Sequence, residues 1–570
     1  MADLHIGKQT IYELFSGIKN KKFIIPDYQR PYKWDKEKCE TLWNDIEQFS
    51  DTNPTEDDFY FLGTIVSFEN DDKNQEIIDG QQRITSFTLL LRAFYKKLED
   101  ATKSDNEIEG LKRQLKPCLW NVNKISGDVD NYSDMKVHSL VIDDEERDIF
   151  HSIIETGNVV EEAKDNYSKN YKFFKEQCDK YAMNNPTRWK ELYVTILNHC
   201  IILPIKCESQ DTALTIFSTL NDRGMPLSDS DIFKAKLYSF QKEEEKSKFI
   251  DSWKEISAIC KKGKVSIDEL FRYYSHIIRA RNGDTSKEIG LRKFYSQNNY
   301  SHLRTPNLLP EIKLLALFWE HINSDIEIRD ELKYNLSFES RKYLSCLKCY
   351  TNEYWKYVVS VFFIRYKDSS NFDNIFQGFI KKVVSYFLVK YLEEPSVNSI
   401  KDDVFKNCAL ILGQLKTPSS DLADKNRKLY EKLENGLIEL INDRKKLTRS
   451  MLLLNAYLTE GQNDLIDEHV EIEHIFPRKW QDTNYNGWSS KDTEIYLEKC
   501  GNKILFEKKL NIQAGNGYFN QKKGKYAQSK IQEVLNLSKY PNEDWLKTDI
   551  ENRDKEIKER LLAFFKDNLK

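Results

Sequence analysis

The chain has 570 residues, a net charge of −4 and a charged fraction of 31%. This length exceeds one ordinary hydrophobic core, so we expect a globular protein of two or three domains. Its apolar runs are far shorter than the roughly 20 residues that cross a bilayer, and no secretion signal is recognised at the N-terminus. We therefore expect neither a membrane nor a secreted protein, but a cytoplasmic one with reduced cysteines.

The first hundred residues are predicted to alternate short strands with turns. Phe23–Ile25 is extended and is stopped by Pro26, whereas Tyr60–Phe68 is rich in β-branched and aromatic residues. The pattern predicts a further strand at Gln75–Ile78. A helix should then begin at Gly80–Gln81 and continue through the apolar residues that follow.

The motif DGQQR, Asp79–Arg83, lies between this strand and this helix. A helix N-terminus attracts anions because its first N–H groups are unpaired and the helix dipole is positive there. Gly80 would admit a phosphate close to the backbone, and Asp79 could hold a magnesium ion or position a water. The side-chain donors to a phosphate would be Gln81, Gln82 and Arg83. In the alternative interpretation, Asp79 caps the helix and Arg83 forms a surface ion pair.

Further elements are predicted after residue 200. We expect a strand at Ile201–Cys207, a helix around Thr212–Leu220 and a turn at Asn221–Pro226. Ser228 should then cap a helix that carries acidic residues in its first turn.

Three separated motifs in this region resemble the ParB-like DGQQR domain of modification-dependent (type IV) restriction enzymes, a family that includes GmrSD and the phosphorothioate-sensing SspE. The motifs are IPDYQRPYKW at 25–34, DGQQR at 79–83 and FSTLNDRGMPLSDSDIFKAKL at 217–237. Over about residues 10–240 the resemblance implies a ParB/sulfiredoxin-like core that binds and hydrolyses a nucleoside triphosphate. It places Asp79, Gln82 and Arg83 at the phosphates and leaves the choice among GTP, ATP, CTP and UTP open. By analogy, the further nucleotide-binding candidates are Arg30, Asn221 and Arg223.

The C-terminal sequence EIEHIFPRKW, Glu471–Trp480, carries a second candidate site. Val470–Phe476 is predicted as a strand, and Gly501–Phe506 as its hairpin partner. In a regular strand Glu473 and His474 point to opposite faces, which suits different tasks. The carboxylate could bind a hard cation, and a neutral imidazole could take a proton from water.

Two asparagines extend this pattern. The amide of Asn502 both donates and accepts, so it could hold the loop after His474 through backbone hydrogen bonds. Asn511 could supply a further metal ligand, with Asn516 as a competing one. The alternative interpretation is a surface histidine in an ordinary hairpin.

Residues 499–530 form the most basic segment that we find, with eight lysines against one glutamate and a net charge of +7. Because it overlaps the second half of the candidate site, this segment could attract nucleic acid locally despite the acidic chain. Lys522 and Lys523 are the candidate contacts. A solvated lysine-rich face is the alternative.

The acid–histidine pair, the two asparagines and the motif YFNQKKGKY at 518–526 resemble the HNH-type nuclease domain commonly fused to the DGQQR domain. The resemblance implies a ββα-metal fold, with Glu473 and Asn511 on the metal and His474 as the base. Here the first metal position is Glu473 and the last is Asn511, where other members have aspartate and histidine. These oxygen ligands favour Mg²⁺ or Mn²⁺ over zinc.

We therefore predict a predominantly helical α+β protein with a ParB/sulfiredoxin-like domain at 1–240, a helical connecting region at 241–450 and a ββα-metal (HNH) domain at 451–570. The predicted function is NTP-dependent, metal-dependent DNA cleavage in anti-phage or modification-dependent restriction. The DNA would be modified or of phage origin, and a homo-oligomer or partner proteins of a defence system are open. The alternative is an NTP-gated clamp on nucleic acid or a partner, with an inactive nuclease-like domain.

Overall fold

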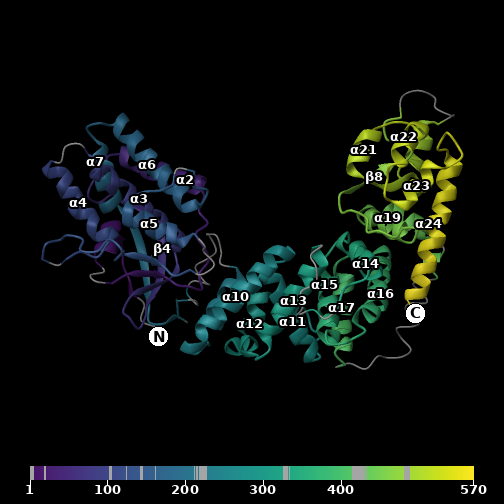
Figure 1. Ribbon diagram of the computed structural model, residues 1–570, viewed down its shortest axis with the longest axis horizontal. Coiled ribbons are helices and arrows are strands. Elements are labelled where there is room, and N and C mark those ends of the chain that lie inside the picture. Colours follow the sequence, from purple (N-terminus) through teal and green to yellow (C-terminus); the bar gives the residue numbers. More distant parts are fainter. Residues whose placement is uncertain are drawn as a thin grey trace. The chain divides into compact units, whose positions relative to one another are not determined.

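The computed structural model describes residues 5–569 except 18–20, 102–104, 124, 142–145, 161, 211, 214–215, 217–227, 325–331, 333, 414–430, 432, 435 and 481–487. The chain forms two compact units, Met1–Lys254 and Glu255–Lys570. Figure 1 labels the helices and strands of both units. Most of the predicted helix at Thr212–Leu220 and all of the predicted turn at Asn221–Pro226 lie outside the described residues.

The first unit contains a mixed seven-stranded sheet. Its strands are β1 (His5–Ile6), β2 (Gln9–Thr10), β3 (Phe23–Ile25), β4 (Tyr60–Glu69), β5 (Gln75–Asp79), β6 (Val137–Ser139) and β7 (Cys200–Cys207). The strand order is β1–β7–β4–β5–β3–β6, with β2 also paired to β7. β4, rich in β-branched and aromatic residues, runs parallel to β7 and antiparallel to β5. The predicted strands at 23–25, 60–68, 75–78 and 201–207 are thus confirmed.

Helices surround this sheet. They are α1 (Ile11–Ser16), α2 (Lys36–Asp51), α3 (Gln81–Glu99), α4 (Asn106–Leu119), α5 (Arg147–Thr156), α6 (Asn166–Asn184), α7 (Trp189–Asn198) and α9 (Asp229–Ser239). Helix α3 packs mainly against α6 and α4 (Figure 1). Nearly all of its side chains are buried. The predicted cap of α9 is confirmed, because the Ser228 side chain accepts from the N–H of Asp231 at 3.2 Å.

The second unit begins with a helical body. Its helices are α11 (Ile267–Arg281), α12 (Leu291–Tyr300), α13 (Leu308–Asn323), α14 (Phe338–Lys348), α15 (Tyr354–Tyr366), α16 (Phe372–Glu393) and α17 (Asn398–Ile411), with the short turn η2 (Ser301–Arg304). Helix α10 (Glu243–Gly263) spans the boundary between the units. Helix α16 lies in the predicted helical connecting region and buries Phe376, Ile380 and Phe387. Cys346 and Cys349 are free thiols, as expected.

The C-terminal part of this unit places a hairpin among helices. The elements are η3 (Lys445–Leu447), α19 (Thr448–Tyr457), β8 (Val470–His474), α20 (Ser490–Tyr496), η5 (Cys500–Asn502), β9 (Lys503–Glu507), α21 (Lys508–Ala514), α22 (Phe519–Tyr526), α23 (Gln532–Ser538) and α24 (Lys547–Asn568). β8 and β9 pair antiparallel, and α21 follows β9 directly. Asn511 lies within α21, three residues after its start at Lys508. The predominantly helical α+β class is confirmed.

Among the described residues, no helix is both long enough and apolar enough to cross a lipid bilayer.

Candidate functional site

The hairpin and the two helices after it bring the predicted C-terminal residues together. In the β8–β9 pairing Glu473 lies opposite Ile504, and His474 lies opposite Lys503. A cavity of about 250 Å³ is lined by Glu473, His474, Asn511, Asn516 and Lys522, among others. Glu473 and His474 therefore share one site with Asn511, which follows His474 by 37 residues.

Glu473 is held by two groups of α22. Lys522 Nζ lies 2.5 Å from Glu473 Oε1, and the Tyr526 hydroxyl donates to the same oxygen at 3.1 Å. Burial raises the pKa of Glu473, and the charge of Lys522 opposes this shift. Both of these side-chain contacts use Oε1, and the His474 backbone N–H also contacts the carboxylate.

His474 is buried and contacts a second carboxylate, with its Nε2 3.2 Å from Glu498 Oε1. Burial lowers the pKa of His474 to about 4, and Glu498 opposes that shift. The imidazole is therefore neutral at pH 7. Because a carboxylate only accepts hydrogen bonds, the shared proton belongs on Nε2, which leaves the lone pair of Nδ1 to accept a proton.

Asn502 fixes the backbone that follows His474. Its Oδ1 accepts from the Phe476 N–H at 2.8 Å, and its Nδ2 donates to the carbonyls of Phe476 at 3.2 Å and Leu497 at 3.0 Å. The Ile475 N–H donates to the Asn502 carbonyl at 2.9 Å. The asparagine thus links the end of β8 to the turn before β9.

The cavity offers oxygen donors suited to a hard cation. Asn511 Nδ2 donates to Glu471 Oε2 at 3.3 Å, which leaves Asn511 Oδ1 free to act as a ligand beside the Glu473 carboxylate. Among the described residues, no three His, Cys, Asp or Glu side chains converge as a closed metal site would require. Two protein oxygens completed by water fit Mg²⁺ or Mn²⁺ better than zinc.

The DGQQR turn of the first unit joins β5 to α3. Asp79 ends β5 opposite Val66, where the β4–β5 register shifts. Gly80 is the N-cap of α3 with φ +92°, and no side chain caps this helix. A Cβ on Gly80 would lie 2.8 Å from Ile65 Cγ1, so glycine is required for packing as well as for conformation. The predicted alternative, in which Asp79 caps the helix, is not what the structure shows.

The Arg83 side chain contacts the backbone of β4. Its Nη1 donates to the Thr64 carbonyl at 2.7 Å, and a Cβ on Gly63 (φ +115°) would lie 2.9 Å from its Cζ. Burial raises the pKa of Asp79, whereas the charges of Arg83 and Arg30 lower it. Arg83 is thus a half-buried group near Asp79 that is bonded to the backbone of β4, not part of a surface ion pair.

Gln82 does not face this turn, which corrects its predicted place at a phosphate. Its Oε1 accepts from the N–H groups of Lys33 at 2.6 Å and Trp34 at 3.2 Å, and its Nε2 donates to the Pro31 carbonyl at 3.1 Å. These three bonds hold the loop before α2. Gln81 Oε1, by contrast, is buried and finds no hydrogen-bond partner in the described part of the chain. The candidates Asn221 and Arg223 lie outside the described residues.

Both the N-terminal and the C-terminal parts of the chain match domains of a known protein family. Residues 11–238 match the N-terminal domain of the GmrSD restriction endonuclease, and residues 423–560 match the C-terminal domain of GmrSD restriction endonucleases. The chain belongs to the GmrSD restriction endonuclease family. It is accordingly a nuclease of the restriction and defence type, with DNA as its substrate. No curated protein matches the sequence.

Each candidate site lies within one GmrSD domain, the DGQQR turn in the first and the hairpin cavity in the second. Two lysines of the C-terminal GmrSD domain are not placed to contact DNA as predicted. Lys522 is 1% exposed and is paired with Glu473, and Lys523 Nζ donates to the carbonyls of Tyr540 and Asn542, each at 2.6 Å. The exposed lysines of the basic segment include Lys508 and Lys509.

The roles of several polar residues in these GmrSD domains were not predicted from the sequence. Beside the DGQQR turn, burial raises the pKa values of Asp27, Glu76 and Asp231, and the Tyr28 hydroxyl donates to Glu76 Oε1 at 2.7 Å. Glu76 could have been found as a candidate polar residue of this site, because it is a carboxylate within a short, otherwise apolar strand. No local pattern marks Glu498 as the partner of His474.

Replacing Asn502 with leucine should destabilise the GmrSD C-terminal domain. The change leaves the buried N–H of Phe476 and two carbonyls without partners, which should lower the free energy of unfolding by about 1–3 kcal/mol. Chemical denaturation monitored by tryptophan fluorescence would measure the loss. Asn520→Leu, on the exposed face of α22, is the matched control, and equal unfolding midpoints for the two variants would contradict the role of Asn502.

Proposed function

We propose that this GmrSD-family chain is a Mg²⁺-dependent DNA endonuclease of the HNH type whose N-terminal domain binds and hydrolyses a nucleoside triphosphate. The observation that carries the nuclease assignment is the shared cavity of Glu473, His474 and Asn511. Mn²⁺ fits the same donors. The DNA is proposed to be modified or of phage origin, in keeping with the restriction family.

In this proposal His474 is the general base. Glu498 fixes the ring through Nε2, so that Nδ1 can take the proton from an attacking water. The Glu473 carboxylate and Asn511 Oδ1 would hold the cation, and Lys522 keeps the carboxylate ionised and oriented. The bound cation would supply Lewis-acid stabilisation of the charge that develops on the phosphate.

The nucleotide is proposed to bind at the N-terminus of α3. This helix has 19 residues and no side-chain cap, so its first N–H groups are available to phosphate oxygens. Arg83 and Arg30 supply positive charge at the turn, and Asp79 would position water or a cation. The four common nucleoside triphosphates remain candidates.

Replacing Asp79 with alanine should abolish nucleotide hydrolysis while the protein remains folded. Asp79 lies at the end of a strand and caps nothing, so its loss removes a polar group from the turn without removing a helix cap. Phosphate release from each of the four triphosphates is the measurement, and the thermal melting temperature reports folding. The His474→Ala variant should hydrolyse nucleotide normally, and unchanged turnover of all four triphosphates by Asp79→Ala would refute the site.

One observation favours the second candidate function, an NTP-gated clamp with an inactive nuclease-like domain. The ammonium group of Lys522 already neutralises Glu473, so the carboxylate does not need a metal for charge balance. This alternative requires DNA binding that responds to nucleotide, with no cleavage in Mg²⁺.

A further inference from the structure

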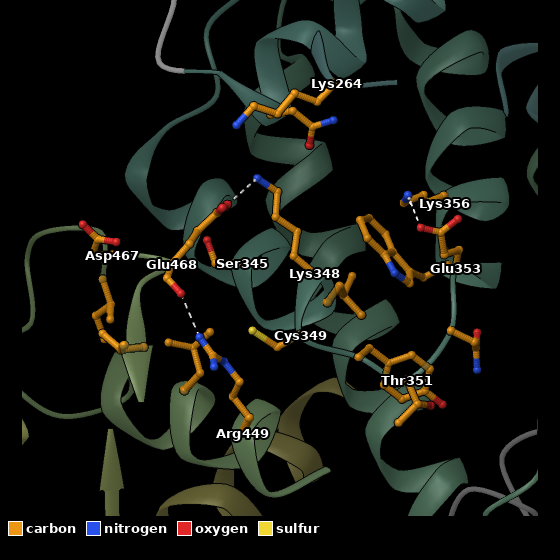
Figure 2. A pocket seen from close by; sticks show the side chains of 18 residues that line it. Lys264, Ser345, Lys348, Cys349, Thr351, Glu353, Lys356, Arg449, Asp467 and Glu468 are labelled. Carbon is orange, nitrogen blue, oxygen red and sulfur yellow. Dashed lines mark hydrogen bonds and ion pairs between the residues drawn. The ribbon is translucent and has the colours of Figure 1, made fainter. Parts of the chain in front are cut away.

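A second, larger cavity lies within the Glu255–Lys570 unit and shares no lining residue with the one at His474. Its volume is about 740 Å³, within the range of about 300–1,000 Å³ typical of small-molecule sites. The end of α14, the connecting segment 349–353 and the start of α15 form much of the wall. Lys264, Asn323, residues of α19, the segment 466–468 and the first residue of β8 complete the lining (Figure 2).

One wall of this cavity carries three buried polar atoms on consecutive residues. Tyr350 Oη, Thr351 Oγ1 and Asn352 Nδ2 make no hydrogen bond with any described residue. Burial raises the pKa of Tyr350, and its neighbours Thr351 and Asn352 oppose that shift. Buried polar groups in native proteins are almost always satisfied, so three adjacent exceptions that line a cavity point to a missing polar partner.

The cations of the cavity differ in how they are neutralised. Lys348 pairs with the Glu468 carboxylate at 3.3 Å, and Lys356 pairs with Glu353 at 2.5 Å. Arg449 instead donates to the backbone carbonyl of Glu468 at 2.8 Å, and no ion pair of Arg449 is found among the described residues. Its positive charge therefore remains available to a ligand.

Lys264 adds a second available cation. It is exposed, it adopts a left-handed conformation with φ +50°, and it makes no ion pair with a described residue. Figure 2 shows Lys264 and Arg449 on opposite sides of Lys348. A non-glycine residue in this conformation is strained, and such strain is often found at binding sites. An anionic group between these cations would offset their charge.

The remaining lining is aromatic and apolar. Trp355, Tyr350, Leu453 and Ile466 belong to this wall, and all four side chains are largely buried. Inorganic phosphate would leave most of a 740 Å³ cavity unfilled. A nucleotide combines a phosphate for the cations, a base for the aromatic surface and polar edges for the hydrogen-bonding wall.

We propose that this cavity is a nucleotide-binding site separate from the DGQQR turn, with the phosphate held by Lys264 and Arg449 and the base held near Trp355, Thr351 and Asn352. This site does not depend on the proposed triphosphatase. It belongs to the second unit, whereas Asp79 belongs to the first.

Equilibrium dialysis of the full chain with radiolabelled AMP and CMP tests the proposal. At least one of the two should bind saturably at one site per chain, and Lys264→Gly and Arg449→Gln should each weaken this binding at least tenfold. Glycine suits the left-handed backbone at position 264, so this variant should keep its fold, which its melting temperature would show. Lys261→Gln, an exposed change one turn earlier in α10, is the matched control and should bind normally, as should Asp79→Ala.

Three results would overturn the proposal. One is the absence of saturable binding of both nucleotides. Another is binding that Asp79→Ala removes and the two cavity variants do not, which would assign the nucleotide to the DGQQR turn. The third is competition by inorganic phosphate as strong as by unlabelled nucleotide, which would reduce the cavity to a simple anion site. None of these results bears on DNA cleavage at His474.

Discussion

Replacing His474 with alanine should reduce DNA cleavage by about 10²- to 10⁴-fold, the usual contribution of a general base. The alanine removes the lone pair of Nδ1 that would accept a proton from water and frees Glu498 from its imidazole partner. The initial rate of plasmid nicking in Mg²⁺ is the measurement. Nucleotide hydrolysis by the same preparation should be unchanged.

His469→Ala is the matched control for this experiment. His469 lies five residues before His474, just outside β8, and its side chain is 87% exposed and contacts Asp467. It should therefore cleave DNA at the rate of the unaltered protein. Cleavage by His474→Ala at the rate of His469→Ala, with both proteins folded, would rule out His474 as the base.

Replacing Lys522 with methionine should lower the free energy of unfolding by about 3–5 kcal/mol, because it leaves the buried Glu473 without its cationic partner. The side chains of Lys522 and Glu473 are 1% and 7% exposed, so solvent screens this pair little. Lys522 also donates to the His474 carbonyl at 2.6 Å, a bond that methionine cannot make. Urea denaturation would measure the loss. Lys525→Met is the control and should stay within about 0.5 kcal/mol, because Lys525 is half-buried and its bond within the described part of the chain is to Gln513 at 3.0 Å.

The same variant reports on cation binding. Without Lys522, a divalent cation is the remaining source of positive charge for Glu473, so Mg²⁺ should raise the melting temperature of Lys522→Met more than that of the unaltered protein. Equal shifts for the two proteins would argue against a cation at Glu473.

The hairpin and the DGQQR turn could be predicted because their signals are local. The β-rich stretch before Pro477 and the strand–glycine–helix order at Asp79 depend on neighbouring residues, and both were found within a few positions of their predicted bounds. The burial of α3 follows from its apolar sequence.

The side-chain roles that failed depend on contacts between distant parts of the chain. Gln82 is engaged by a loop about 50 residues upstream, and Lys522 is engaged by Glu473 across the hairpin. Sequence periodicity does not show whether a lysine faces solvent or a buried carboxylate. The net charge of residues 499–530 therefore overestimated the number of lysines that are placed to contact DNA. The pairing of His474 with Glu498 was missed for the same reason.

The most direct test of the central claim is DNA cleavage by the unaltered chain and by the Glu473→Gln and Asn511→Ala variants, each in Mg²⁺ and in EDTA. The substrates should include unmodified, hydroxymethylated, glucosylated and phosphorothioate DNA. The unaltered chain should cut at least one of these only in Mg²⁺, and both variants should lose that activity while remaining folded. Cleavage that persists in EDTA, or that survives Glu473→Gln undiminished, would show that DNA is not cut at this cavity.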